Sequence, residues 1–359
     1  MKFQGKTIRH VGLGALCLAT LIGFLILVAC SSSRNSHIAY VVGGSNSIAA
    51  FRIDDTSGSA TQILASPFTT GKAPSSLAVH PANKLLYVAN QGENTISRFK
   101  IDSTSGVLTE VLPRTITGIS PIAITMDGGG SFLYVANQGS NNVSVFSIAS
   151  DGGLSEAAGS PYAVASSPSG LTLSGSFLFV PVPNFSLIYV FSVNSGTLTQ
   201  VGSPVVVPDG ISTLATDSEP KFLYAPNPST NTVTGFAIQP DGTLTPVPDS
   251  PFPTGIAPFA AMVNAANNAL YVANSGATTI SQFMIDSSSG SLMAFSTATA
   301  SVGRTPEFIL NGPSGKFVFV GNLGASSITE LPFNKDGSLG SSANTIQVGF
   351  PPRSLAFSQ

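Results

Sequence analysis

A five-residue segment, Leu-Tyr-Val-Ala-Asn, repeats along the chain and limits its fold more than any other feature. It occurs unchanged at 86–90, 133–137 and 270–274, and in degenerate form four more times. The aromatic residues of the seven copies are Tyr40, Tyr87, Tyr134, Phe179, Tyr224, Tyr271 and Phe319. Their spacing is 45 to 48 residues, and a second marker keeps the same period: Phe51, Phe99, Phe146, Phe191, Phe236, Phe283 and Leu331. Repeats of this length are typical of propeller blades and solenoids.

Each repeat contains short β-forming runs separated by turns. The runs 96–101 and 143–148 are rich in β-branched and aromatic residues. Turn pairs that supply the positive φ of tight hairpins follow them: Ser105-Gly106, Asp151-Gly152, Ser195-Gly196, Asp241-Gly242, Ser289-Gly290 and Asp336-Gly337. A third run, such as 198–201, and a fourth, such as 77–79, complete the unit. Four strands per unit and seven units predict an all-β, seven-bladed β-propeller with four-stranded blades.

The ends of the repeat region predict how the ring closes. The first repeat begins on the Tyr-bearing run 37–42, with no strand of the fourth type before it. The last run, 353–357, resembles the fourth-type run 75–79. We therefore expect the C-terminal strand to pair into the N-terminal blade as its innermost strand, which covers two open sheet edges. The propeller domain is predicted to span 37–359.

The first 29 residues are predicted to be a lipoprotein signal peptide. A basic start precedes the uncharged stretch 11–29, and Leu27-Val28-Ala29-Cys30 resembles the lipobox of bacterial lipoproteins. This resemblance implies lipidation of Cys30 and a lipid-anchored tether over 30–36. The alternative is an uncleaved membrane helix, because 19 uncharged residues nearly span a bilayer. Both alternatives place the propeller outside the cytoplasmic membrane, and Ser31 resembles the outer-membrane sorting signal of Gram-negative lipoproteins.

Composition excludes several classes of function. Charged residues make up 9% of the chain, and removing the three basic residues of the leader leaves 12 basic against 17 acidic ones. A net charge near −5 argues against a nucleic-acid partner. The sequence has no phosphate-binding Gly-rich loop, zinc-ligand spacing or calcium loop, so no metal or cofactor is expected. The other cysteine, Cys17, lies in the leader, which leaves no pair for an internal disulfide in the predicted mature chain.

Three features together resemble the lactonase family of seven-bladed propellers, known for Tyr-Val-Thr-Asn-type repeats. They are the Leu-Tyr-Val-Ala-Asn copies, the Asp/Ser-Gly-x-Leu-Thr hairpins, and the Gly-x-x-Pro lead-ins at 71–74, 255–258 and 303–306. Members of that family include 6-phosphogluconolactonases and a muconate-cycling enzyme. The resemblance implies a cleft at the central channel that holds His, Arg and Glu. The implied activity is hydrolysis of a small sugar-acid-type lactone.

One position per repeat, directly after the lead-in, is expected to face the channel. These positions hold Ser75, Ile122, Ser169, Ser212, Phe259, Glu307 and Arg353. None is the histidine that several family lead-ins carry, and only His37 and His80 lie beyond the leader. His80 belongs to a His-Pro turn, where a solvated surface role is expected. Glu307 and Arg353 are therefore the candidate catalytic residues.

The chemistry expected of these two residues is lactone hydrolysis. A glutamate can orient or deprotonate water, and an arginine can neutralise a carboxylate or an oxyanion. Arg304, Lys72 and Asp209, on the lead-in loops, are candidate substrate-binding residues. The alternative for Glu307 and Arg353 is an ion pair between blades that fastens the ring.

Two functions follow from these alternatives. The first is a lactonase-like protein of the cell envelope with a small acidic or lactone ligand. The second is a non-catalytic binding or scaffolding propeller that presents a face to a protein partner.

Overall fold

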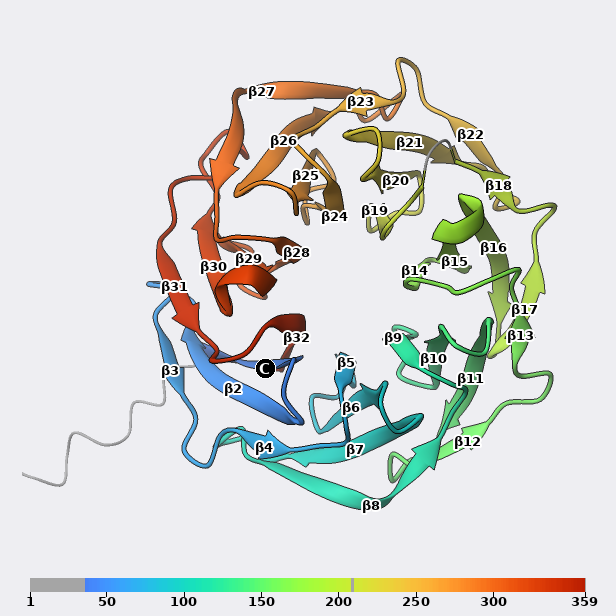
Figure 1. The fold of residues 1–359 in the computed structure, drawn as a ribbon, viewed down its shortest axis with the longest axis vertical. Coiled ribbons are helices and arrows are strands. Elements are labelled where there is room, and N and C mark those ends of the chain that lie inside the picture. Colours follow the sequence, from blue (N-terminus) through green and yellow to red (C-terminus); the bar gives the residue numbers. More distant parts are fainter. Residues whose placement is uncertain (1–35, 208–209, 359) are drawn as a thin grey trace, which may run out of the picture. The chain divides into compact units, whose positions relative to one another are not determined.

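The computed structural model describes residues 36–207 and 210–358, which form seven antiparallel sheets arranged in a ring (Figure 1). The first sheet comprises β1 (Ser36–Gly43), β2 (Ser47–Asp54), β3 (Ala60–Gln62), β4 (Phe68–Thr69) and β32 (Pro352–Ser358). The second comprises β5 (Pro74–Val79), β6 (Leu85–Asn90), β7 (Thr95–Ile101) and β8 (Leu108–Ile116). The third comprises β9 (Pro121–Met126), β10 (Phe132–Asn137), β11 (Asn142–Ile148), β12 (Leu154–Glu156) and β13 (Tyr162–Ala163).

The remaining four sheets follow in chain order around the ring. The fourth comprises β14 (Thr172–Ser174), β15 (Phe177–Val182), β16 (Leu187–Asn194), β17 (Thr197–Gln200) and β18 (Val205–Val206). The fifth comprises β19 (Ala215–Thr216), β20 (Phe222–Asn227), β21 (Thr232–Ile238), β22 (Leu244–Pro246) and β23 (Phe252–Pro253). The sixth comprises β24 (Pro258–Val263), β25 (Ala269–Asn274), β26 (Thr279–Ile285) and β27 (Leu292–Ser301). The seventh comprises β28 (Pro306–Asn311), β29 (Phe317–Asn322), β30 (Ser327–Pro332) and β31 (Asn344–Gln347).

Each blade has four strand positions, and the innermost strands β5, β9, β14, β19, β24, β28 and β32 surround the centre (Figure 1). The predicted seven-bladed propeller is confirmed. In the first, third, fourth and fifth blades the outermost position is divided between two short strands. Each gap contains a proline: Pro67, Pro161, Pro204 and Pro251. Proline has no N–H to donate to a neighbouring strand, although β8 continues past Pro113 in the second blade.

The last strand closes the ring as the sequence predicts. Strand β32 lies antiparallel to β1, with Tyr40 opposite Ala356 and Val41 opposite Leu355. The N-terminal and C-terminal segments therefore share the first blade. The ladder that joins them runs from Ile38 to Gly43 of β1.

The repeated Leu-Tyr-Val-Ala segment is apolar throughout because both of its faces are buried between blades. In β6, Leu86 and Val88 pack with Tyr40 of the first blade, whereas Tyr87 packs with Leu133 of the third. Successive residues of a strand point to opposite faces of the sheet. One strand therefore contributes to two inter-blade cores, and the seven cores together hold the ring.

The helices in the described part of the chain are two single 3₁₀ turns, η1 (Pro183–Phe185) and η2 (Leu323–Ala325). Neither they nor any other helix among residues 36–207 and 210–358 is long and apolar enough to cross a membrane. The predicted signal peptide and Cys30 lie outside the described residues.

Candidate active site in the central cavity

The lead-in to the innermost strand of the seventh blade is held by a close glycine–asparagine contact. A Cβ on Gly303 would lie 2.7 Å from the side-chain carbon of Asn322, so only glycine fits there. Asn322 is fully buried, and its amide group donates to the Thr329 hydroxyl at 2.8 Å. The chain then turns through Thr305, whose φ is +53°, into Pro306. The same glycine–asparagine contact recurs at Gly71, Gly118 and Gly255, which explains why the repeat keeps both residues.

A β-bulge directly after the lead-in proline aims one side chain at the centre of the ring. In the seventh blade Pro306 pairs with Asn322 and Phe308 with Gly321, which leaves Glu307 without a cross-strand partner. The same shift leaves Ser75, Ile122, Phe259 and Arg353 unpaired in their blades. Bulges re-aim side chains and occur often beside active sites.

These side chains line a central cavity of about 320 Å³. Six of the seven predicted channel positions belong to its wall: Ser75, Ile122, Ser169, Phe259, Glu307 and Arg353. In the fifth blade the wall contains Thr213 in place of Ser212. That blade has no proline-led bulge, and the Ser212 hydroxyl donates instead to the carbonyl oxygen of Phe259.

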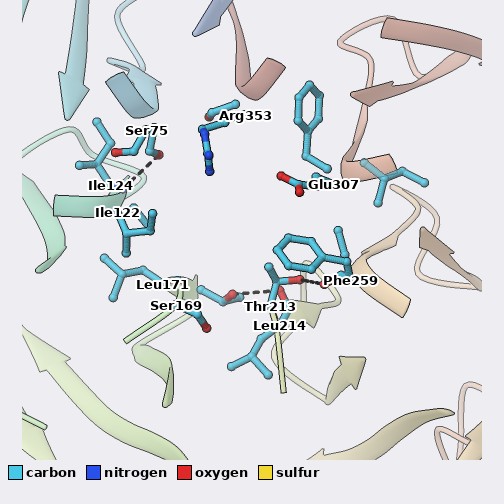
Figure 2. A pocket seen from close by; sticks show the side chains of 18 of the residues that line it. Ser75, Ile122, Ile124, Ser169, Leu171, Thr213, Leu214, Phe259, Glu307 and Arg353 are labelled. Atoms are coloured by element: carbon cyan, nitrogen blue, oxygen red, sulfur yellow. Dashed lines mark hydrogen bonds between the residues drawn. The ribbon is translucent and has the colours of Figure 1, made fainter. Parts of the chain in front are cut away.

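Among the described residues, the charged side chains of the wall are Glu307 and Arg353. They come from adjacent blades, and both point into the cavity (Figure 2). Neither forms an ion pair or a hydrogen bond within residues 36–207 and 210–358. Burial raises the pKa of the Glu307 carboxyl, and the positive charge of Arg353 lowers that pKa in part. Both groups are thus available to a ligand, which does not support the alternative of an ion pair that fastens the ring.

The six hydroxyl side chains of the wall are engaged differently. Each makes a hydrogen bond with the backbone of the next blade; the residues are Ser75, Ser76, Ser169, Thr172, Thr213 and Ser354. The Ser75 hydroxyl, for example, donates to the carbonyl oxygen of Pro121 at 2.7 Å. The Ser76 hydroxyl accepts from the amide of Ile124 at 3.2 Å. These serines and threonines join neighbouring innermost strands, and sequence reasoning did not identify this role.

The predicted substrate-binding residues do not all meet in the cavity. Arg304 and Lys72 are exposed and stand outside the wall. The Arg304 guanidinium donates to the carbonyl oxygen of Gly324 at 3.3 Å. Asp209 lies outside the described residues. The cavity therefore brings together Glu307 and Arg353, whereas Arg304 and Lys72 remain on the lead-in loops.

The two histidines of the described chain serve structural contacts away from the cavity wall. His80 Nδ1 accepts from the amide of Ala82 at 3.1 Å, and Nε2 lies 3.0 Å from the carbonyl oxygen of Gly130 in the next blade. His80 therefore links two blades, in addition to the surface role expected from the sequence. His37 Nδ1 lies 2.7 Å from the carboxylate of Asp55. Within the described ranges, no group of three His, Cys, Asp or Glu side chains could hold a metal ion.

A family profile described as lactonase, 7-bladed beta-propeller, matches residues 30–169 and 257–354. The chain belongs to this lactonase family. The matched segments contain both charged residues of the cavity wall. No curated protein is similar enough in sequence to match this lactonase-family chain.

Solved structures with the same architecture include three proteins whose names refer to gluconolactonases. A candidate 6-phosphogluconolactonase from Bacteroides fragilis matches with a TM-score of 0.80 and 21% identity, over 92% of this chain and 99% of that one. One from Bacteroides uniformis gives 0.78 and 19%, over 90% and 100%. The periplasmic gluconolactonase of Pseudomonas aeruginosa gives 0.77 and 22%, over 90% and 99%. At these identities the similarity of the lactonase-family chain to them concerns the fold.

Proposed function

We propose that this lactonase-family chain hydrolyses a small lactone in its central cavity. The observation that carries the proposal is that Glu307 and Arg353 face one cavity without being paired to each other. A carboxylate and a guanidinium that do not neutralise each other can act on the same ligand. Lactones of sugar acids are the first substrates to test, because the family resemblance implies them.

In the proposed reaction Glu307 acts as a general base. Its carboxylate accepts a proton from a water molecule as the water oxygen attacks the carbonyl carbon of the lactone. Arg353 stabilises the negative charge that develops on the carbonyl oxygen. The acyl carbon–oxygen bond of the ring then breaks, and the ring oxygen takes the proton from Glu307. Burial raises the pKa of Glu307, which makes its carboxylate a stronger base than an exposed one.

The direct test is hydrolysis of a panel of γ- and δ-lactones by the purified protein, followed by acid release at constant pH. Glu307→Gln keeps the size of the side chain and removes the base. We expect it to lower kcat by at least about a hundredfold, the scale of general-base catalysis. Loss of turnover in Glu307→Gln with turnover retained in Arg304→Ala, outside the cavity wall, supports the proposal. Equal rates in wild type and Glu307→Gln contradict it.

A specific observation favours a second candidate function, that of a non-catalytic binding propeller. The described residues of the cavity wall include no histidine, and their hydroxyl groups bind backbone atoms of neighbouring blades. In this second function Glu307 and Arg353 bind a small ligand without turnover. The propeller presents the bound ligand, or one of its own faces, to a protein partner. Ligand binding without acid release from any lactone distinguishes this function from the first.

We further propose that the protein is anchored in the cell envelope by a lipid on Cys30. The proposal rests on the lipobox-like sequence before Cys30 and on the polar tether after it. In a Gram-negative cell, Ser31 directs such a lipoprotein to the outer membrane. A cavity outside the cytoplasm would meet lactones that arrive from the environment.

A further inference from the structure

The chemistry of the cavity wall changes from one side to the other. The two charged residues belong to two adjacent blades, the seventh and the first. The blades from the third to the seventh contribute bulky apolar side chains to the wall: Ile122, Ile124, Leu171, Leu214, Phe259, Phe308 and Ile309. Figure 2 shows Ile122 and Leu171 across the cavity from Glu307. The two charged side chains thus come from neighbouring blades, and the apolar side chains of the third to seventh blades form the apolar side of the cavity.

The other polar side chains of the described wall are hydroxyl groups. All six hydroxyl groups already bind the backbone of the next blade. A ligand with many hydroxyl groups needs a partner for each one, because removing an unpaired polar group from water weakens binding. Each hydroxyl group of the wall has already used part of its hydrogen-bonding capacity on a neighbouring blade, whereas Glu307 and Arg353 form no hydrogen bond among the described residues and keep all of theirs.

We infer that the cavity selects a small amphipathic acid or lactone: one carboxylate or lactone carbonyl at Glu307 and Arg353, and an unsubstituted alkyl or aryl part against the apolar side. This inference rests on the proposed function in that it uses the same site. It differs from the family expectation in the ligand, because a polyhydroxylated sugar acid does not suit this wall. Each buried methylene strengthens binding about fourfold, whereas each buried hydroxyl group must share wall hydroxyls that already bind a neighbouring blade.

A matched pair of six-carbon monocarboxylates tests the inference by calorimetric titration of the purified protein. Hexanoate and gluconate carry the same charge, and gluconate has hydroxyl groups on its five other carbons. We expect hexanoate to bind at least about tenfold more tightly than gluconate, from the loss of several methylene contacts. Equal or tighter binding of gluconate overturns the inference, and so does a failure of hexanoate to bind.

Variants of the apolar side locate the selectivity. Ile122→Ser places at this bulge the residue that the second and fourth blades carry at the same channel position, Ser75 and Ser169, so the fold accepts serine there. We expect this variant to weaken hexanoate binding at least about fourfold and to leave gluconate binding unchanged. Phe259→Ser, in the sixth blade, should also weaken hexanoate binding and leave gluconate binding unchanged.

Ile119→Ser is the control, because Ile119 is 57% exposed and outside the cavity wall. An Ile119→Ser effect as large as that of Ile122→Ser contradicts the inference. The hydrolysis assay is separate from these titrations. Selective binding of hexanoate without lactone turnover refutes the catalytic proposal and leaves this inference standing. Turnover of glucono-δ-lactone together with tight gluconate binding supports the catalytic proposal and overturns this inference.

Discussion

The hydroxyl group of Tyr87 donates a hydrogen bond of 2.9 Å to the carbonyl oxygen of Gly152, which lies 65 residues later in the next blade. The same contact joins Tyr40 to Gly106, Tyr224 to Gly290 and Tyr271 to Gly337. The repeated tyrosine and the glycine of the hairpin turn are therefore two ends of one inter-blade contact. Burial raises the pKa of Tyr87 to about 12, so the hydroxyl keeps its proton at neutral pH.

Tyr87→Phe should lower the free energy of unfolding by about 1 kcal/mol, because it removes this buried hydrogen bond. Tyr134 is the matched control, since its hydroxyl is buried and has no hydrogen-bond partner in the described chain. Tyr134→Phe should be neutral or stabilising. Denaturant unfolding of both variants measures the difference, and equal losses of stability contradict the assigned role of the Tyr87 contact.

Glu330 makes stability depend on pH at the junction where the ring closes. It is fully buried on β30, its carboxyl packs against Gly58 of the first blade, and one of its oxygens has no partner among the described residues. Burial raises the pKa of Glu330 to about 7, against a smaller opposing effect of the hydrogen bond from Asn344. The folded state therefore holds this proton more tightly than the unfolded state does. Its contribution is fully present below about pH 4.5 and is lost as the pH rises to about 7.

Glu330→Gln should remove this pH dependence. Glutamine is already present at the equivalent position of the sixth blade, where Gln282 accepts from the amide of Leu339 at 2.6 Å. We expect the variant to gain stability relative to wild type as the pH rises from 5 to 8, by on the order of 3 kcal/mol at full ionisation. Thermal unfolding across that range, with the exposed Glu156→Gln as control, measures it. A constant difference at all pH values would contradict the assignment.

Arg353→Ala should separate ligand binding from stability. The Arg353 side chain is exposed to the cavity and forms no ion pair among the described residues, so its loss should change the free energy of unfolding by less than about 0.5 kcal/mol. An acidic ligand that raises the melting temperature of wild type should no longer do so. Arg304→Ala, outside the wall, should keep the ligand effect. A large drop in stability without ligand would favour a fastening role for Arg353.

Deletion of residues 352–359 should remove β32 and expose the edge of β1. Loss of a whole innermost strand should cost several kcal/mol, comparable to the total stability of a typical domain, so the truncated chain should aggregate or melt far below wild type. Ser358 pairs with Ile38, which places the end of β32 beside the start of β1. Joining 352–358 ahead of residue 36 through a short loop should therefore restore the melting temperature. An unchanged melting temperature after the deletion is incompatible with the closed ring.

Cys30→Ser tests the proposed anchor. If Cys30 is lipidated, the variant should leave the membrane fraction or accumulate as the unprocessed precursor, because serine lacks the thiol that receives the lipid. Cell fractionation and the intact mass of the protein measure both outcomes. Cys17→Ser, within the predicted signal peptide, is the control and should behave as wild type. A Cys30→Ser protein that remains processed and membrane-bound refutes the lipoprotein assignment.

The sequence predicts most of the fold because the period of its repeats is regular. Glu307 and Arg353 follow their lead-ins at the same register, so their meeting in one cavity could be expected before the structure was known. The fifth blade lacks this regular spacing, because no proline directly precedes Ser212. The wall there holds Thr213 instead.

The contacts between blades could not be predicted in the same way. A serine at position 75 is compatible with a nucleophile, a ligand contact or a structural hydroxyl. The distance of 2.7 Å to the Pro121 carbonyl oxygen, which is set by the packing of two sheets, identifies the last of these. The role of Glu330 could not be predicted from the sequence either, because its neighbour Gly58 is 272 residues earlier in the chain.

The bulges at the inner ends of the blades have a consequence for how such a propeller can change its ligand. A bulged residue has no partner across the sheet, so replacing it alters no cross-strand pair. Five of the positions around the cavity are of this kind, at 75, 122, 259, 307 and 353. Two substitutions, at 307 and 353, can remove both charged side chains of the described wall while the ladders of every blade stay intact. Selectivity can therefore diverge among chains of this architecture faster than their stability does.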